Sequence, residues 1–211
     1  FLENHDETRI ASESFAGNAW YAVPGMVVTA TLSTGPILIY NGQEVGEPAI
    51  GASGFSGDDG RSTIFDYWGM PQHQKWMNNG VFDGAKLDDS SRNLRQFYSK
   101  LLNLSTNNEA ISSGIFYELL QANETSEGFN EKVYAFLRYS ASKKVLILAN
   151  FNRTERQLKV VLPSDVLETF NLNDQPLLFT DLLSNTEFRT ENINNGLEIN
   201  LPSTSAVILE F

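Results

Sequence analysis

Five short runs of β-branched and other apolar residues fill the second half of the chain, and they constrain its fold more than any other feature. Each run is short enough for a single strand, and polar, turn-forming residues separate the runs. In one of them Leu197, Ile199 and Leu201 alternate with polar residues, as in a strand with one buried face. Several such strands at close spacing predict an antiparallel β-sandwich. The runs are KVYAFLRY, KVLILAN, RQLKVVL, GLEINL and SAVILEF.

The first half has a different pattern, which is typical of an α/β layer fold. The stretch 19–33 is mostly apolar with small residues, and it favours a buried helix. Residues 36–40, PILIY, are β-rich and predict a strand buried on both faces. Residues 91–104 place leucine and phenylalanine at helical spacing behind a capping run of Asp and Ser, which predicts a helix. We therefore expect two domains, residues 1–107 and 108–211.

A long irregular region, residues 43–89, separates the predicted strand from the second helix. Loops of this length are functional or disordered, and clustered aromatic residues here favour order. Trp68 and Trp76 fit an ordering role better than sugar stacking. Asp58, Asp59 and Asp66 lack the spacing of an EF-hand, so no metal site and no cofactor are predicted.

Composition excludes several classes of partner. Acidic residues outnumber basic ones 26 to 15, and no Lys/Arg cluster is present, which argues against nucleic acid. No apolar run is long enough to cross a membrane. The absence of cysteine excludes disulfides and thiolate chemistry but leaves the redox compartment open.

Polar and charged residues crowd the first ten positions, FLENHDETRI, as in an active site. FLENHDETR resembles the segment that closes the seventh barrel strand in the α-amylase family of glycoside hydrolases (family 13-like). GPILIYNGQEVGE resembles the eighth strand of that family, with slightly altered spacing at Pro36. The helix at 91–104 then resembles the last barrel helix. The resemblance implies an α+β fragment: the last strands and helices of a TIM (β/α)8 barrel, followed by an all-β antiparallel sandwich.

The resemblance also implies roles for three residues. Asp6 is similar to the family's third catalytic carboxylate, which stabilises the distorted sugar in the transition state. His5 is similar to the neighbouring donor that binds the same glucosyl unit. Arg9 is similar to a substrate-binding charge that orients the acidic cluster, although an ion pair that merely holds the loop is an equal alternative.

The nucleophile and the acid/base of the family belong to earlier strands, which the sequence lacks. We therefore expect the C-terminal fragment of a retaining α-glucan hydrolase or transglycosylase, acting on starch-like or malto-oligosaccharide substrates and inactive alone. The missing upstream segment or self-association would cover the exposed barrel edge. A soluble parent in the periplasm or outside the cell is expected. The alternative is a non-catalytic carbohydrate-binding or structural β-sandwich, presenting Tyr117, Tyr134 and Tyr139 to starch or touching no sugar.

Overall fold

The computed structural model describes residues 1–50, 59–65 and 69–211. The chain divides into two compact units. Unit 1 comprises Phe1–Ala22 and Pro36–Leu102, and unit 2 comprises Val23–Gly35 and Asn103–Phe211. The expected domains 1–107 and 108–211 stay a prediction. In the structure the first helix belongs to the unit that holds the strands.

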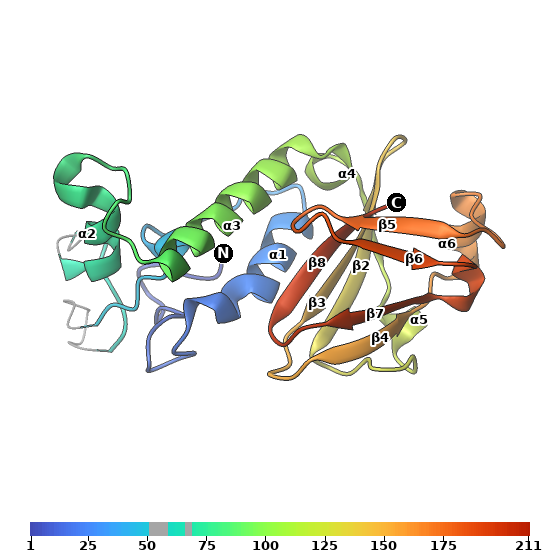
Figure 1. Ribbon diagram of the computed structural model, residues 1–211, viewed down its shortest axis with the longest axis horizontal. Coiled ribbons are helices and arrows are strands. Elements are labelled where there is room, and N and C mark those ends of the chain that lie inside the picture. Colours follow the sequence, from blue (N-terminus) through green and yellow to red (C-terminus); the bar gives the residue numbers. More distant parts are fainter. Residues whose placement is uncertain (51–58, 66–68) are drawn as a thin grey trace. The chain divides into compact units, whose positions relative to one another are not determined.

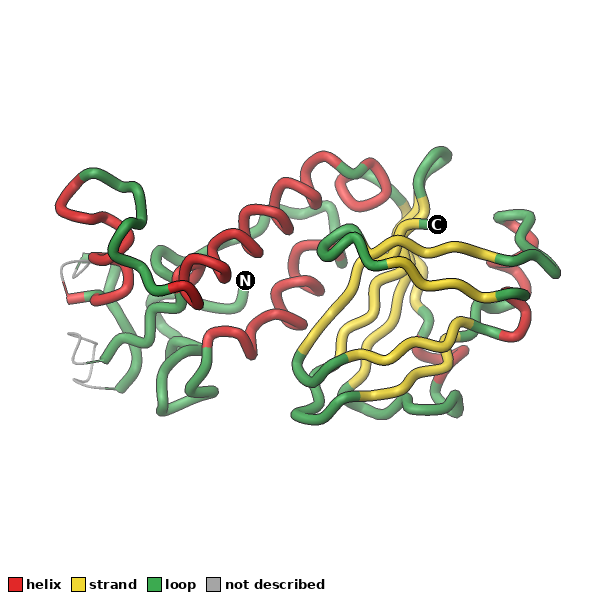
Figure 2. The backbone as a smooth tube through the Cα atoms, viewed as in Figure 1, coloured by secondary structure: helices red, strands yellow, loops and turns green. Residues whose placement is uncertain are grey.

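Unit 2 is built on antiparallel strands (Figure 1). Its larger sheet has the order β1-β2-β3-β8-β5-β6, and β4 pairs with β7 in a second, two-stranded sheet. Figure 2 shows both sheets in yellow. The bounds are β1 Ile115–Glu118, β2 Val133–Tyr139, β3 Lys144–Asn150, β4 Arg156–Val160, β5 Leu177–Asp181, β6 Glu187–Thr190, β7 Leu197–Leu201 and β8 Ser205–Glu210.

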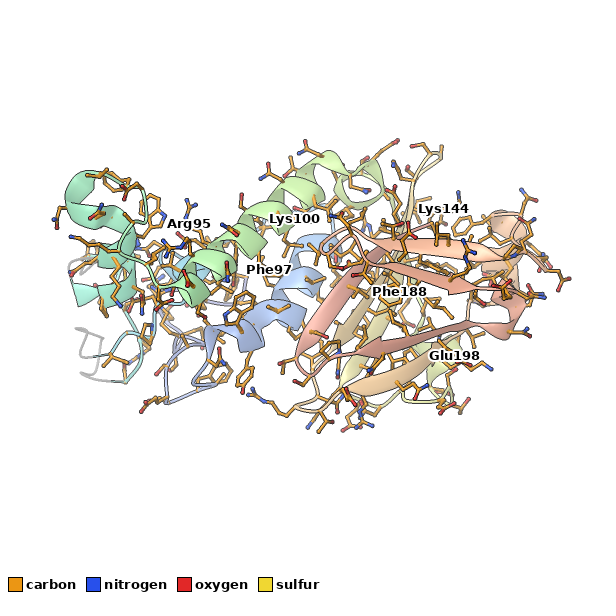
Figure 3. The ribbon with its side chains drawn as sticks, in the orientation of Figure 1. Arg95, Phe97, Lys100, Lys144, Phe188 and Glu198 are labelled. Atoms are coloured by element: carbon orange, nitrogen blue, oxygen red, sulfur yellow. The ribbon has the colours of Figure 1, made fainter. Side chains whose placement is uncertain are left out.

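One hydrophobic core joins the two sheets. It takes Leu137 and Leu146 from the larger sheet and Leu158 and Ile199 from the smaller one, all fully or almost fully buried. Along β7 buried residues alternate with exposed ones such as Glu198, as expected (Figure 3). The predicted antiparallel β-sandwich is confirmed, and all five predicted runs are strands. Strands β1, β5 and β6 were not predicted.

Helix α1, Val23–Thr31, follows a 3-10 turn η1, Ala19–Ala22, and confirms the helix expected in this region. It lies against β3 and β8, and its Met26, Val27 and Ala30 are buried. Strand β3 is consequently buried on both faces: one faces the sandwich core, and the other is covered by a helix. A helix from the first half of the sequence thus completes the core of the second.

Arg138 of β2 is a buried cation within unit 2, with 3% of its surface exposed. Its guanidinium donates hydrogen bonds to four backbone carbonyls, which belong to Leu32, Ala110, Ile111 and Gly114. Burial lowers the pKa of this guanidinium. Leu32 follows the end of α1, whereas Ala110 and Ile111 lie in α4, Glu109–Ser112, and Gly114 follows it. One side chain therefore satisfies carbonyl groups at the ends of two helices.

The helix predicted at 91–104 is also confirmed, as α3, Asp89–Asn107. Its buried stripe contains Leu94, Tyr98 and Leu101. Phe97 is only half-buried, and its ring lies 6.4 Å from that of Trp20. The remaining short helices are α5 Leu120–Asn123, α6 Ser164–Thr169 and η5 Ile193–Asn195. None of the helices in the described residues is long and apolar enough to cross a bilayer.

Unit 1 contains only helices and loops in its described residues, which are 1–22, 36–50, 59–65 and 69–102. The strand expected at residues 36–40 is not observed. This segment is not paired in a sheet, and Leu38 is 50% exposed. A strand needs a hydrogen-bonded neighbour, and unit 1 supplies none. The barrel assignment therefore stays a prediction. The helices of the loop region are η2 Gln43–Val45, α2 Pro71–Met77 and η4 Asn78–Gly80.

Candidate functional site

A buried ion pair lies within the first ten residues. Arg9 Nη1 is 2.9 Å from Glu3 Oε2, and the two side chains are 0% and 4% exposed. The other oxygen of Glu3 accepts a hydrogen bond of 2.8 Å from the backbone N–H of Ile10. Burial raises the pKa of the Glu3 carboxyl, and the Arg9 guanidinium opposes that shift. The pair closes residues 3–10 into a loop with a rigid base.

Arg9 also ties this loop to two other segments of unit 1. Its Nε and Nη2 donate to Ser62 Oγ over 3.0 and 2.6 Å, and Nη2 donates to the carbonyl of Asn41 over 2.8 Å. The guanidinium carbon lies 4.1 Å from the centre of the Tyr40 ring. Its backbone N–H donates to Gly60. One buried side chain thereby joins the first loop to the segments around residues 41 and 61.

His5 and Asp6 form the exposed tip of this loop. The side-chain oxygen of Asn4 accepts hydrogen bonds from the backbone N–H groups of Asp6 and Glu7, over 2.8 and 3.0 Å, which makes a tight Asx turn. His5 Nε2 lies 3.5 Å from Asp6 Oδ2, and their side chains are 49% and 67% exposed. The structure therefore brings these two predicted residues together and presents both outward from a rigid base.

A partly exposed ion pair between Arg61 and Asp59 lies near this turn. Arg61 donates to Asp59 from Nε over 2.7 Å and from its backbone over 3.0 Å. The hydrogen bond with Asp59 raises the pKa of the Arg61 guanidinium, and the charges of Asp6 and Glu7 act in the same direction. The Asp59 carboxylate thus accepts hydrogen bonds from Arg61. The other two aspartates considered for a metal site, Asp58 and Asp66, lie outside the described residues.

The second family-like segment, GPILIYNGQEVGE, enters the same network through Tyr40 and Gln43. Tyr40 donates its hydroxyl proton to the carbonyl of Ser62 over 2.6 Å. Gln43 accepts from the Tyr40 backbone through Oε1 and donates to the Tyr98 hydroxyl through Nε2. Gly42 has a φ of 90°, a conformation that favours glycine. Both family-like segments are therefore anchored by shared contacts, although they are far apart in sequence.

Glu47 is a buried carboxylate that sequence reasoning missed. Its Oε2 accepts from the backbone N–H groups of Gln72 and His73, in the first turn of α2, over 2.9 and 3.1 Å. Its Oε1 accepts from Ala49 over 3.0 Å. A carboxylate at a helix start is favourable, because it satisfies N–H groups that have no intrahelical partner. No local signal could reveal it, because the helix begins more than twenty residues later.

Of the two tryptophans predicted to order the region 43–89, only Trp76 lies within the described residues. Trp76 packs against Phe82 with ring centres 5.5 Å apart, and the guanidinium of Arg95 lies 5.0 Å above its ring (Figure 3 labels Arg95 on α3). These contacts fit the expected ordering role. Trp68 lies outside the described residues.

The predicted substrate contact of Arg9 finds no support in this geometry. Its side chain is completely buried, and its hydrogen bonds go to Glu3, Ser62 and Asn41. The alternative stated for this residue, an ion pair that holds the loop, fits the observed contacts. The assignments of His5 and Asp6 to substrate stay predictions.

Comparison with known families now bears on the sandwich. The family model described as "Alpha amylase, C-terminal all-beta domain" matches residues 127–211. The match covers the strands from β2 to β8. The resemblance of the chain to the C-terminal part of α-amylase-family enzymes is thereby confirmed. No curated protein matches the sequence.

Crystal structures of amylases are similar to nearly the whole chain. AmyP in complex with maltose has 21% identity over 99% of this chain and 39% of its own, with a TM-score of 0.65. The noncanonic maltogenic α-amylase AmyB from Thermotoga neapolitana has 15% identity over 100% and 40%, with a TM-score of 0.63. The α-amylase from H. orenii has 20% identity over 100% and 39%, with a TM-score of 0.57. At these sequence identities the similarity shows a shared fold. The chain spans about two fifths of the length of the three amylases.

Proposed function

We propose that this chain is the C-terminal part of a retaining α-glucan hydrolase or transglycosylase. The observation that carries the proposal is the exposed His5–Asp6 turn, held by the buried Glu3–Arg9 pair. The match of residues 127–211 to the C-terminal all-β domain of α-amylases supports the proposal. Two similar structures, both of AmyP, contain maltose or maltotriose, which supports starch-like or malto-oligosaccharide substrates for the parent. Export to the periplasm or the exterior would suit such substrates.

In this proposal Asp6 stabilises the transition state. A carboxylate held beside the reacting sugar accepts hydrogen bonds from its hydroxyl groups, and these strengthen as the ring approaches an oxocarbenium ion. The gain is largest when the carboxylate is already in position before the reaction. The Asn4 turn supplies that preorganisation by holding the backbone of Asp6 and Glu7. His5, beside Asp6, binds the same glucosyl unit.

Arg9 acts as a positioning residue. Its guanidinium connects the turn to Ser62 and Asn41 and has no exposed surface for sugar. Fixing the loop base limits the directions in which Asp6 can move. The role of Arg9 is therefore carried through Glu3 and the loop backbone.

The nucleophile and the acid/base are assigned to the upstream part of the parent. A retaining site needs two carboxyls roughly 5 to 5.5 Å apart. Glu3 cannot serve, because it is buried and paired with Arg9. Glu7 and Glu44 remain in unit 1, but no family role corresponds to either. The 211-residue chain is therefore expected to be inactive alone.

The upstream segment is also the proposed cover for residues 36–40. This apolar segment does not pair with a strand, and Leu38 is half exposed. In a complete barrel it would be hydrogen bonded on both edges. A second copy of the chain is the alternative cover, and the oligomeric state of the chain in solution distinguishes the two.

The deciding experiment compares two chains for release of reducing sugar from malto-oligosaccharides. One is the 211-residue chain with its intact mass confirmed, and the other is extended upstream by a barrel segment. Activity only in the extended chain is the expected result. Turnover by the short chain would assign the missing carboxyls to Glu7 or Glu44 and overturn this account.

The alternative stated above, a carbohydrate-binding or purely structural β-sandwich, concerns unit 2. Tyr117 donates to Asp165 over 2.8 Å, and the Tyr134 ring packs 5.1 Å from that of Phe136. These contacts favour a packing role for both tyrosines over an exposed platform for starch. We assign the sandwich the role of covering α1, which it contacts through β3 and β8.

A further inference from the structure

A cavity of about 480 Å³ lies in unit 2, where β2 ends and β3 begins. Its volume is within the range of small-molecule sites, about 300 to 1,000 Å³. Figure 3 labels Lys144, which lines it. The other residues used below are Tyr139 at the end of β2, Glu109 of α4, and Phe170 and Asn171 after α6.

Two aromatic rings form the apolar part of this cavity. Tyr139 and Phe170 meet edge to face, with ring centres 5.0 Å apart and planes at 72°. Both side chains are partly exposed. Lys144 Nζ lies 5.3 Å from the centre of the Phe170 ring. Such a ring pair is rigid and offers apolar surface beside polar groups, which is how aromatic residues serve in binding sites.

Unused hydrogen-bonding groups surround the rings. Within the described residues, no hydrogen bond is made by the Tyr139 hydroxyl, the Lys144 ammonium or the Asn171 side-chain amide. The Glu109 carboxylate accepts one hydrogen bond, from Ser142 Oγ over 2.7 Å. The cavity therefore offers several donors and acceptors together, in a pattern that suits a ligand with many hydroxyl groups.

Charge narrows the class of ligand further. Lys144 and Glu109 carry opposite charges, so the cavity has no net charge from this pair. The chain as a whole has a net charge of -11, which disfavours polyanions. A neutral ligand that is polar at its edges and apolar on its ring faces fits best, and a sugar ring has that character.

We propose that this cavity is a non-catalytic binding site for a short neutral oligosaccharide of α-linked glucose. The neutral, polyhydroxylated character follows from the cavity, and the choice of α-linked glucose rests on the proposed function. The site lies in unit 2, whereas His5 and Asp6 lie in unit 1. Holding a polymer at a second point raises its effective concentration at the enzyme, even when each contact is weak.

The test is an NMR titration of the ¹⁵N-labelled 211-residue chain with maltoheptaose, and with cellohexaose as the linkage control. Tyr139→Phe keeps the ring pair and removes only the hydroxyl. Tyr134→Phe is the matched control, because it removes a hydroxyl from the same strand outside the cavity. Glu13→Gln, an exposed carboxylate of unit 1, serves as a second control.

Amide shifts around Ser140 and Asn171 are expected with maltoheptaose, and the dissociation constant should rise at least about fivefold in Tyr139→Phe. Tyr134→Phe and Glu13→Gln should bind as the wild type does. Unchanged affinity in Tyr139→Phe, or no shifts at the residues that line the cavity, would overturn the site. Equal binding of cellohexaose would overturn the assignment to α-linked glucose. Since binding does not need Asp6, a failure here is distinguishable from a failure of the catalytic proposal.

Discussion

Glu3 and Arg9 form a buried ion pair, with Arg9 Nη1 2.9 Å from Glu3 Oε2, six residues apart in sequence. The pair encloses the loop that presents His5 and Asp6. Because both partners are desolvated, each depends on the other for its charge to be tolerated. The geometry of the proposed sugar site thus depends on a contact that no sugar touches.

Arg9→Met is expected to destabilise the chain by about 3 to 5 kcal/mol near neutral pH, because it leaves the Glu3 carboxylate buried without its cation. Burial already raises the pKa of Glu3, and loss of Arg9 raises it further. A folded-state pKa above the unfolded one stabilises the fold at low pH, and this contribution is lost as pH rises through the folded pKa. The loss caused by the substitution should therefore grow from about pH 4 to about pH 7.

Urea unfolding of both proteins across that pH range measures this difference. Arg92→Met is the control, because its ion pair with Asp89 is exposed and should change the unfolding free energy by less than about 1 kcal/mol. A pH-independent loss in Arg9→Met would show that the guanidinium acts through packing alone.

Gly60→Ala is expected to destabilise unit 1 more than Gly17→Ala. Both glycines have positive φ, 76° and 70°, so alanine is strained at each by about 1 kcal/mol. At Gly60 the added Cβ would also overlap the Ser12 side chain, whose Cβ would be 2.7 Å away, whereas at Gly17 nothing is within 4 Å. Overpacking adds about 1 to 3 kcal/mol. Thermal unfolding of the two variants measures this difference, and equal losses would contradict the close approach of Gly60 and Ser12.

Arg138→Met should destabilise unit 2 by about 3 kcal/mol or more, because it leaves four backbone carbonyls without their donor. Hydrogen exchange should show the loss first near the ends of α1 and α4. Arg156→Met is the comparison, since within the described residues the Arg156 side chain makes one hydrogen bond, of 3.3 Å to Asn152. Similar exchange in both variants would mean that the carbonyls find other partners.

Asp6→Asn in the upstream-extended chain is expected to lower kcat by about 10²- to 10³-fold with little change in KM, by analogy with groups that bind mainly the transition state. Steady-state kinetics on maltoheptaose measures both constants. Glu13→Gln, an exposed carboxylate of the same unit, is the control and should leave kcat unchanged. An unchanged kcat in Asp6→Asn would remove this residue from the mechanism.

The sandwich strands and the two long helices could be predicted because their signals are local. Alternation in 197–201 and the spacing of Leu94 and Leu101 each reflect which face is buried. Strands β1, β5 and β6 were missed because they are short and partly exposed. Residues 36–40 have the composition of a strand, but within the described residues no other segment pairs with them, so composition alone did not suffice there.

The sequence by itself determined the sandwich, the helices and the clustering of His5 and Asp6 in one turn, because these follow from patterns a few residues long. Tertiary structure alone decided that Arg9 is buried, that Ser62 and Asn41 receive its hydrogen bonds, and that Glu47 serves the start of α2. Those partners lie more than twenty residues apart. No local period encodes such pairs, because burial and hydrogen bonding select them only when the folded chain brings the segments together.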